Sequence, residues 1–256
     1  MLDRRTLLIG LTAAAVSPRA SGAAVLPVTP QEMLGPFYPE HPLPDHDFDL
    51  TRIRGHNGRA RGETIEVVGR VLRRDGTPVA NARLEVWQAN AAGKYRHPND
   101  TNTASLDPDF QGYARLLSGK DGSFRFITVK PGAYPAAIGM RAPHVHFDVQ
   151  SQSCRLSTQM YFPGEPLNAT DPLLSTLSAR HLNPALAMAH EDNELRGLTR
   201  FHYDMVLWSY ARAWAKWRNV RKWSQAAIVP MGNERQILTR YQSVRPWTLA
   251  QAGDCR

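Results

Sequence analysis

The sequence predicts an all-β protein: an antiparallel β-sandwich with an irregular N-terminal segment and a C-terminal extension. Seven short segments have the residue types and alternation of half-buried strands, and turn dipeptides such as Asp75-Gly76 and Asp121-Gly122 stand between them. The 19 prolines and 18 glycines among 256 residues argue against an all-helical protein. Many short strands separated by turns are typical of a β-sandwich.

The seven expected strands follow one another between residues 65 and 208. The first ends before Asp75-Gly76, and the third and fourth flank Asp121-Gly122, which predicts a hairpin. The stretch 171–196 is expected to be a loop, with a short helix near 184–191 as an option. The expected strands are 65–71, 83–87, 113–117, 123–129, 145–149, 157–162 and 201–208.

The chain divides into four expected parts, the first of which resembles a signal peptide. In residues 1–24, Arg4-Arg5 precedes an apolar stretch that is too short to span a bilayer, and small residues follow. This twin-arginine pattern predicts an exported, periplasmic protein with no integral membrane segment. The other parts are the proline-rich segment 25–60, the sandwich 61–210 and the extension 211–256.

The C-terminal extension is basic and rich in tryptophan. Residues 212–256 hold nine Lys or Arg against two acids, which is nearly the whole net charge of +8. Apolar positions recur every three residues around Trp214, Trp217 and Trp223, so a helix is one alternative, but its face is not defined. Because aromatic residues together with arginine are typical of interfaces, we expect this extension to join a homo-oligomer rather than to bind nucleic acid or lipid.

The most informative short motif is His144-Val145-His146, which follows Arg141 and Pro143. Pro143 disfavours a helix just before it, and in a strand residues i and i+2 point to the same side. Two imidazoles side by side on a stiff element form half of a typical metal site, although two surface histidines are the alternative. The two cysteines, Cys154 and Cys255, are too few for a thiolate metal site, and whether they form a disulfide stays open.

Four short segments of the chain carry a common pattern, namely 84–97, 130–135, 141–146 and 158–162. In their order and chemistry they resemble the intradiol ring-cleavage dioxygenases, and the protocatechuate-cleaving branch most of all. The resemblance extends from about residue 35 to about residue 207, and segment 34–39 resembles the family's chain across the active-site mouth.

This resemblance implies an iron enzyme that opens a catechol-type ring with O2 and yields a cis,cis-muconate-type diacid. It implies a cofactor Fe(3+) bound by two tyrosines and two histidines, namely Tyr95, Tyr134, His144 and His146. Tyr134 would also act as a base, and Arg141 and Gln159 would face the substrate. His97 lies near Tyr95 in the sequence, but no motif makes it a ligand.

Departures from the family pattern leave the substrate open. Ala136 stands where relatives often have an aromatic residue, and the loop between Tyr134 and His144 is shorter than in the protocatechuate enzymes. Two other classes remain as alternatives. One is a cupin-like metal enzyme, although Val149 and Gln150 stand where cupins have a glutamate. The other is a prealbumin-like binding module, which residues 122–134 resemble.

Overall fold

The computed structural model describes residues 25–39, 41, 44–152, 154–179, 188–195 and 198–208. The expected signal peptide and the C-terminal extension lie outside these residues. Within them, no helix is long and apolar enough to cross a membrane. Cys154 is disulfide-bonded, whereas Cys255 lies outside the described part of the chain.

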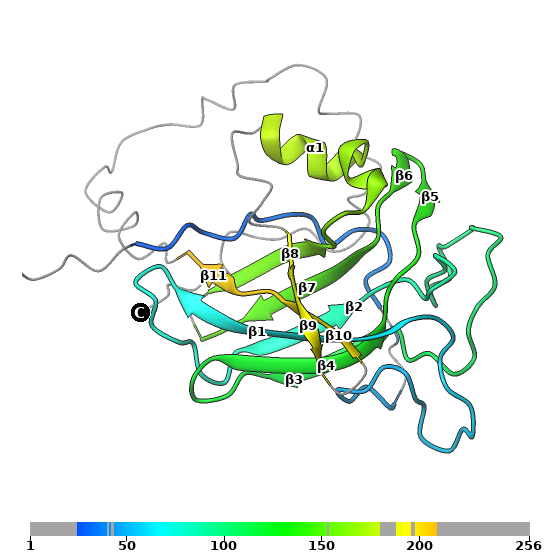
Figure 1. Ribbon diagram of the computed structural model, residues 1–256, viewed down its shortest axis with the longest axis horizontal. Coiled ribbons are helices and arrows are strands. Elements are labelled where there is room, and N and C mark those ends of the chain that lie inside the picture. Colours follow the sequence, from blue (N-terminus) through cyan, green and yellow to red (C-terminus); the bar gives the residue numbers. More distant parts are fainter. Residues whose placement is uncertain are drawn as a thin grey trace, which may run out of the picture.

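Two sheets pack face to face and confirm the predicted sandwich (Figure 1). The first sheet contains five strands: β1 (Thr64–Arg73), β4 (Ser123–Val129), β9 (His190–Leu195), β10 (Leu198–His202) and β11 (Met205–Leu207). The second contains four in the order β3 (Tyr113–Leu117), β2 (Arg83–Trp87), β7 (His144–Gln150) and β8 (Arg155–Tyr161). All seven expected segments therefore form strands, three of them with the predicted bounds.

The sandwich is not wholly antiparallel, and this corrects the sequence prediction. β1 pairs with β4 in antiparallel fashion, but its other edge pairs in parallel with both β10 and β11. The expected strand 201–208 is split in two because Asp204 interrupts the ladder, where its carboxylate accepts the backbone N–H of Arg70.

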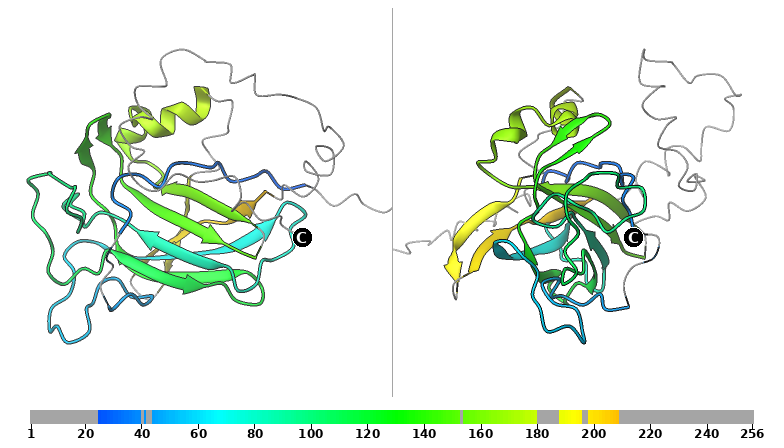
Figure 2. Two further views of the ribbon diagram at one scale, coloured as in Figure 1. Left: turned by 180° about the vertical axis from the view of Figure 1, so that it is seen from behind. Right: turned by 90° about the vertical axis from the view of Figure 1, so that its right-hand side faces the viewer.

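Smaller elements lie at one end of the sandwich. β5 (Tyr134–Ala136) and β6 (Gly139–Arg141) form a hairpin, and a 3-10 turn, η1 (Pro166–Ala169), precedes α1 (Pro172–Ala179). All views show α1 at the same end as the hairpin (Figures 1 and 2). The option of a helix near 184–191 is wrong at its C-terminal end, because His190 and Glu191 lie in β9; residues 180–187 are outside the described part.

The core lies between the sheets and follows from strand alternation. On β7, Val145, Phe147 and Val149 face the first sheet and are fully buried, and Phe147 contacts Phe126 of β4 edge to face. The alternate residues of β7 point to the outer face of the second sheet. His144 and His146 are therefore carried on a strand that the core holds rigidly.

The segment that follows residue 25 runs along the free edge of β8. Glu32 N–H donates to the carbonyl of Ser157, and the Thr158 hydroxyl donates to the carbonyl of Pro30. Thr29 N–H donates to the carbonyl of Val206 in β11, so the segment ties both sheets together (Figure 2). It covers the exposed edge of the second sheet and continues toward the outward-facing histidines.

Candidate metal centre

The two histidines of β7 lie side by side on the outer face of the second sheet. Each is only 2% exposed, and their Nε2 atoms are 3.2 Å apart. Strand alternation brings them together, as the sequence predicts. The side chains around them decide whether the pair can bind a metal ion.

Two tyrosines reach the same point from separate loops. Tyr95 follows β2 and Tyr134 opens β5, and their hydroxyl oxygens lie 3.5 and 3.4 Å from His144 Nε2. Gly93 permits this approach, because a side chain there would place its Cβ 2.2 Å from the carbonyl oxygen of Ala133. The four predicted ligands are thus brought together, with their donor atoms around a common centre.

The four donors fit a metal ion in chemistry and in spacing. Donor atoms in adjacent positions about 2.0–2.1 Å from one ion lie roughly 3 to 3.5 Å apart, which matches these distances. Burial raises the pKa of Tyr95 and of Tyr134 and lowers the pKa of His144 and of His146, so all four are neutral without a cation. Two phenols that lose their protons on binding would supply two negative charges, which suits a trivalent ion.

The four donors are recognisable as a possible metal site only when tyrosine is counted as a ligand. Among the described residues, no cluster of three or more His, Cys, Asp or Glu has the arrangement of a metal site. His97 stays outside the cluster, since its Nδ1 accepts the backbone N–H of Asn99 and its ring lies beside Phe37.

The two imidazoles are held by different means. His144 Nδ1 is 2.6 Å from the carbonyl oxygen of Ala142, which leaves Nε2 free to coordinate. His146 instead stacks on Trp87, with ring centroids 4.8 Å apart and planes within 6°. Gly35 closes over the same ring, where an added Cβ would lie 3.3 Å from His146 Cε1.

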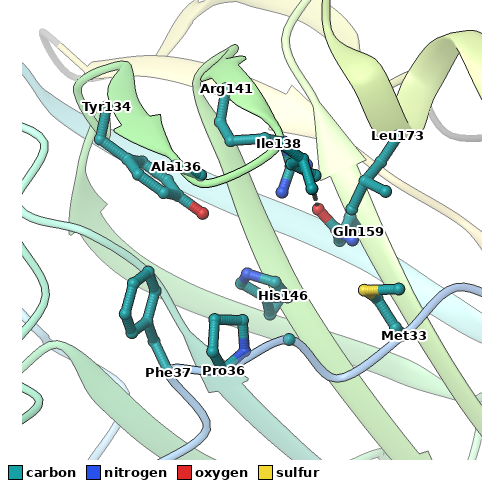
Figure 3. A pocket seen from close by; sticks show the side chains of 11 residues that line it. Met33, Pro36, Phe37, Tyr134, Ala136, Ile138, Arg141, His146, Gln159 and Leu173 are labelled. Atoms are coloured by element: carbon teal, nitrogen blue, oxygen red, sulfur yellow. Dashed lines mark hydrogen bonds between the residues drawn. The ribbon is translucent and has the colours of Figure 1, made fainter. Parts of the chain in front are cut away.

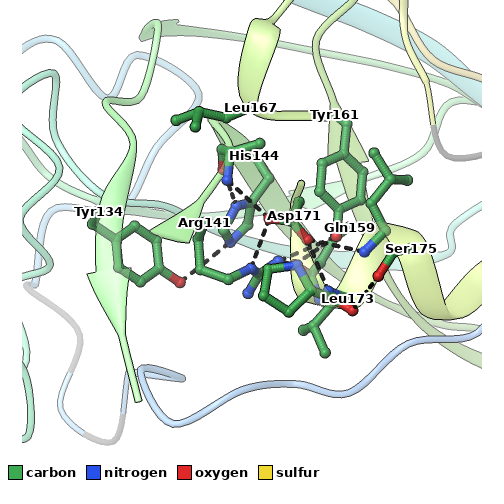
Figure 4. A network of polar contacts seen from close by, with 12 residues as sticks. Tyr134, Arg141, His144, Gln159, Tyr161, Leu167, Asp171, Leu173 and Ser175 are labelled. Carbon is green, nitrogen blue, oxygen red and sulfur yellow. Dashed lines mark hydrogen bonds and ion pairs between the residues drawn. The ribbon is translucent and has the colours of Figure 1, made fainter. Parts of the chain in front are cut away.

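Arg141 stands beside the cluster and is held in place by a polar network (Figure 4). Its Nε donates to Asp171 at 2.9 Å, and its Nη2 donates to Gln159 Oε1 at 2.7 Å and to the Tyr161 hydroxyl at 3.1 Å. Arg141 is 4% exposed and Asp171 is fully buried, so this is a buried ion pair in which each charge needs the other.

Sequence reasoning missed three members of this network: Asp171, Tyr161 and Glu32. Asp171 also caps α1, because its Oδ1 accepts the N–H groups of Leu173 and Leu174. The dipeptide Asp171-Pro172 is a helix-start signal that could have revealed this residue. Glu32 accepts from the Tyr161 hydroxyl at 3.2 Å and from Gln159 N–H at 3.3 Å, and burial raises its pKa to about 7.

A pocket that is partly open to solvent lies in front of the cluster (Figure 3). Tyr134, Arg141, His146 and Gln159 form its polar end. Gln159 Nε2 is buried and has no hydrogen-bond partner among the described residues, so it is available to a ligand. The rest of the lining is mainly apolar and includes Met33, Pro36, Phe37, Ala136, Ile138 and Leu173.

A family model described as a dioxygenase matches residues 33–209. The chain is 46% identical over 148 residues to the protocatechuate 3,4-dioxygenase beta chain of Burkholderia cepacia, covering 56% of this chain and 63% of that one. It is 32% identical over 160 residues to the alpha chain from the same organism, covering 59% and 78%. It is also 33% identical over 201 residues to hydroxyquinol 1,2-dioxygenase of Nocardioides simplex, covering 70% and 64%.

A solved structure has the same fold. The dioxygenase domain of a dioxygenase–carbohydrate-binding fusion from Streptomyces sp. SirexAA-E is 28% identical and covers 71% of this chain and 98% of its own, with a TM-score of 0.53. The matched region spans somewhat less than two thirds of the B. cepacia beta chain and of the N. simplex enzyme.

Proposed function

Because this chain belongs to the intradiol ring-cleavage dioxygenase family, we propose that it binds Fe(3+) and cleaves a catechol-type ring between its two hydroxyl carbons. Both atoms of O2 enter the product, a cis,cis-muconate-type diacid. The observation that supports this most is that the hydroxyl oxygens of Tyr95 and Tyr134 both lie within 3.5 Å of His144 Nε2, which is itself 3.2 Å from His146 Nε2, beside the pocket.

A bound ferric ion would supply the redox chemistry, by drawing electron density from the diol so that its ring becomes reactive toward O2. The four protein donors would hold the ion and set the charge of the site. Tyr134 has a second task. Its phenolate oxygen accepts one of the two protons of the incoming diol, so the tyrosine acts as a general base.

Arg141 and Gln159 contact the substrate rather than the metal. Arg141 is a fixed cation next to the ring, where negative charge builds up during attack, and a preorganised charge of this kind contributes strongly to catalysis. Gln159 turns its Oε1 to Arg141, which leaves its unpartnered Nε2 to donate to a substrate oxygen. Residues 33 and 35–37 line the same pocket and face these two side chains.

The proposal is tested by colour and oxygen uptake together. Purified protein loaded with ferric iron should absorb in the visible through tyrosinate charge transfer and consume O2 with catechol. Tyr95→Phe and Tyr134→Phe should each change the visible band, whereas Tyr113→Phe, a buried tyrosine in the same aromatic cluster, should leave it unchanged. Unaltered spectra in the first two variants would rule out these ligands.

The cupin-like and prealbumin-like alternatives gain no support from the relatives. We also propose, from the Arg4-Arg5 pattern alone, that the protein is exported through the twin-arginine route to the periplasm. Cell fractionation of the wild-type protein and of an Arg4→Lys, Arg5→Lys variant tests this: the variant should stay in the cytoplasm.

A further inference from the structure

The lining of the pocket combines a few polar groups with a larger apolar part. Tyr134, Arg141, His146 and Gln159 are the polar part, and Ala136, Ile138, Leu173 and Met33 lie around them (Figure 3). A catechol bound for cleavage must turn its two hydroxyls to the metal ligands. A substituent on the far side of the ring therefore faces the apolar part of the lining.

The positive charge at this pocket is already balanced. Arg141 is the one cation among the described residues that line it, and it is paired with the buried carboxylate of Asp171. A second carboxyl, that of Glu32, lies close by. It accepts a hydrogen bond from the Tyr161 hydroxyl, which in turn accepts one from Arg141. Among the described residues that line the pocket, no surplus cation remains for a negatively charged substituent.

The start of α1 does not supply the missing charge either. Helix N-termini attract anions through their free N–H groups, and Leu173 at the start of α1 lines the pocket. However, the N–H groups of Leu173 and Leu174 both donate to Asp171 Oδ1 at 2.9 Å. The N–H groups at this helix end are thus already occupied by the carboxylate that pairs with Arg141.

We propose that this pocket selects neutral catechols, either unsubstituted or with a compact apolar substituent, and excludes ring carboxylates such as protocatechuate. This rests on the proposed function and narrows its substrate class. The B. cepacia chain that is 46% identical carries protocatechuate in its name, so this preference would separate the two chains. A buried carboxylate without a partner is strongly unfavourable, so catechol should exceed protocatechuate in kcat/KM by on the order of a hundredfold or more.

Four diols distinguish charge from size in the full-length, iron-loaded protein. Catechol, 4-methylcatechol and the methyl ester of protocatechuate are neutral, whereas protocatechuate has nearly the shape of its ester but carries a charge. Ring cleavage is followed by oxygen uptake, and binding is measured separately by calorimetry. The neutral diols, including the ester, should be bound and cleaved well, and the acid poorly.

A charge placed in the wall should reverse the preference. Ile138 is half-buried at the turn between β5 and β6, so Ile138→Lys can reach both the pocket and solvent. It should raise the ratio of protocatechuate to catechol kcat/KM by about tenfold or more. Ile138→Gln, of similar length without the charge, is the matched control and should leave this ratio low.

Each outcome tests either the substrate preference or the proposed function. Good cleavage or tight binding of protocatechuate by the wild type would overturn the inference and leave the dioxygenase proposal intact. Equal rejection of acid and ester would also overturn it, since size and not charge would then be the cause. If no diol were cleaved, the proposed function would fail, and the calorimetric preference among the four diols would still test the pocket.

Discussion

Replacing Glu32 by glutamine should remove a destabilising charge from beside the candidate site. The carboxyl of Glu32 lies against Gln159 and Tyr161, and burial there raises its pKa to about 7, from about 4.5 in water. The folded protein therefore holds this proton more tightly than the unfolded chain does. As the pH rises from about 4.5 through 7, the group lowers the free energy of unfolding, and the loss is complete above pH 7.

The size of the effect follows from the two pKa values. A pKa difference of one corresponds to about 1.4 kcal/mol, so the full difference corresponds to about 3 kcal/mol. The side chain is partly exposed, and solvent screening reduces the expected effect to about 2 kcal/mol. Glutamine keeps an acceptor for Gln159 N–H and a group that can bond Tyr161, so the variant should fold.

Urea denaturation of both proteins across pH measures this directly. The stability of Glu32→Gln relative to the wild type should grow by about 2 kcal/mol between pH 5 and pH 8. Glu63→Gln removes a charge from an exposed residue and should show no such growth. A Glu32→Gln advantage that did not change with pH would refute the reasoning, since the wild-type carboxyl would then ionise as freely as in water.

Three further changes test the ligands, the network and the extension. His144→Ala and His146→Ala should each abolish stable iron retention, and metal analysis that found full iron in either variant would count against its role as a ligand. Asp171→Ala should lower the free energy of unfolding by about 3 kcal/mol or more, because it leaves Arg141 buried without its partner and uncaps α1; a loss below about 1 kcal/mol in urea denaturation would contradict this. Truncation after Tyr210 should lower the oligomeric state while the iron colour remains, and an unchanged sedimentation coefficient would remove the extension from the interface.

Local patterns predicted most of the sandwich, because strand alternation and turn dipeptides are read within a few residues. The bounds of β2, β3 and β4 agree with the sequence prediction for this reason. The β5–β6 hairpin was missed because each strand has three residues and β5 contains Pro135, which gives no alternation to detect. The parallel pairing of β1 with β10 and β11 was missed because it joins segments more than 130 residues apart.

The candidate site was likewise predicted where motifs are local and missed where contacts are long-range. The four proposed metal ligands were predicted because each lies in a recognisable motif, and the structure brings their side chains together. Asp171 and Glu32 were missed because they meet Arg141 and Tyr161 only through the tertiary fold, across 30 and 129 residues. No periodicity marks Glu32, which lies in an irregular segment.

The stacking of Trp87 on His146 makes the candidate metal centre sensitive to strand register. These two residues are directly opposite each other in the pairing of β2 with β7, and Glu85 is opposite Asp148. A slip of β2 by two residues would keep its apolar residues in the core, because the alternation of the strand is preserved. The slip would, however, place the carboxylate of Glu85 where the indole of Trp87 now stacks on His146. The hydrophobic core alone cannot distinguish these two arrangements. The visible colour of the iron-loaded protein can therefore serve as a reporter of correct strand alignment during refolding, when circular dichroism would detect little difference.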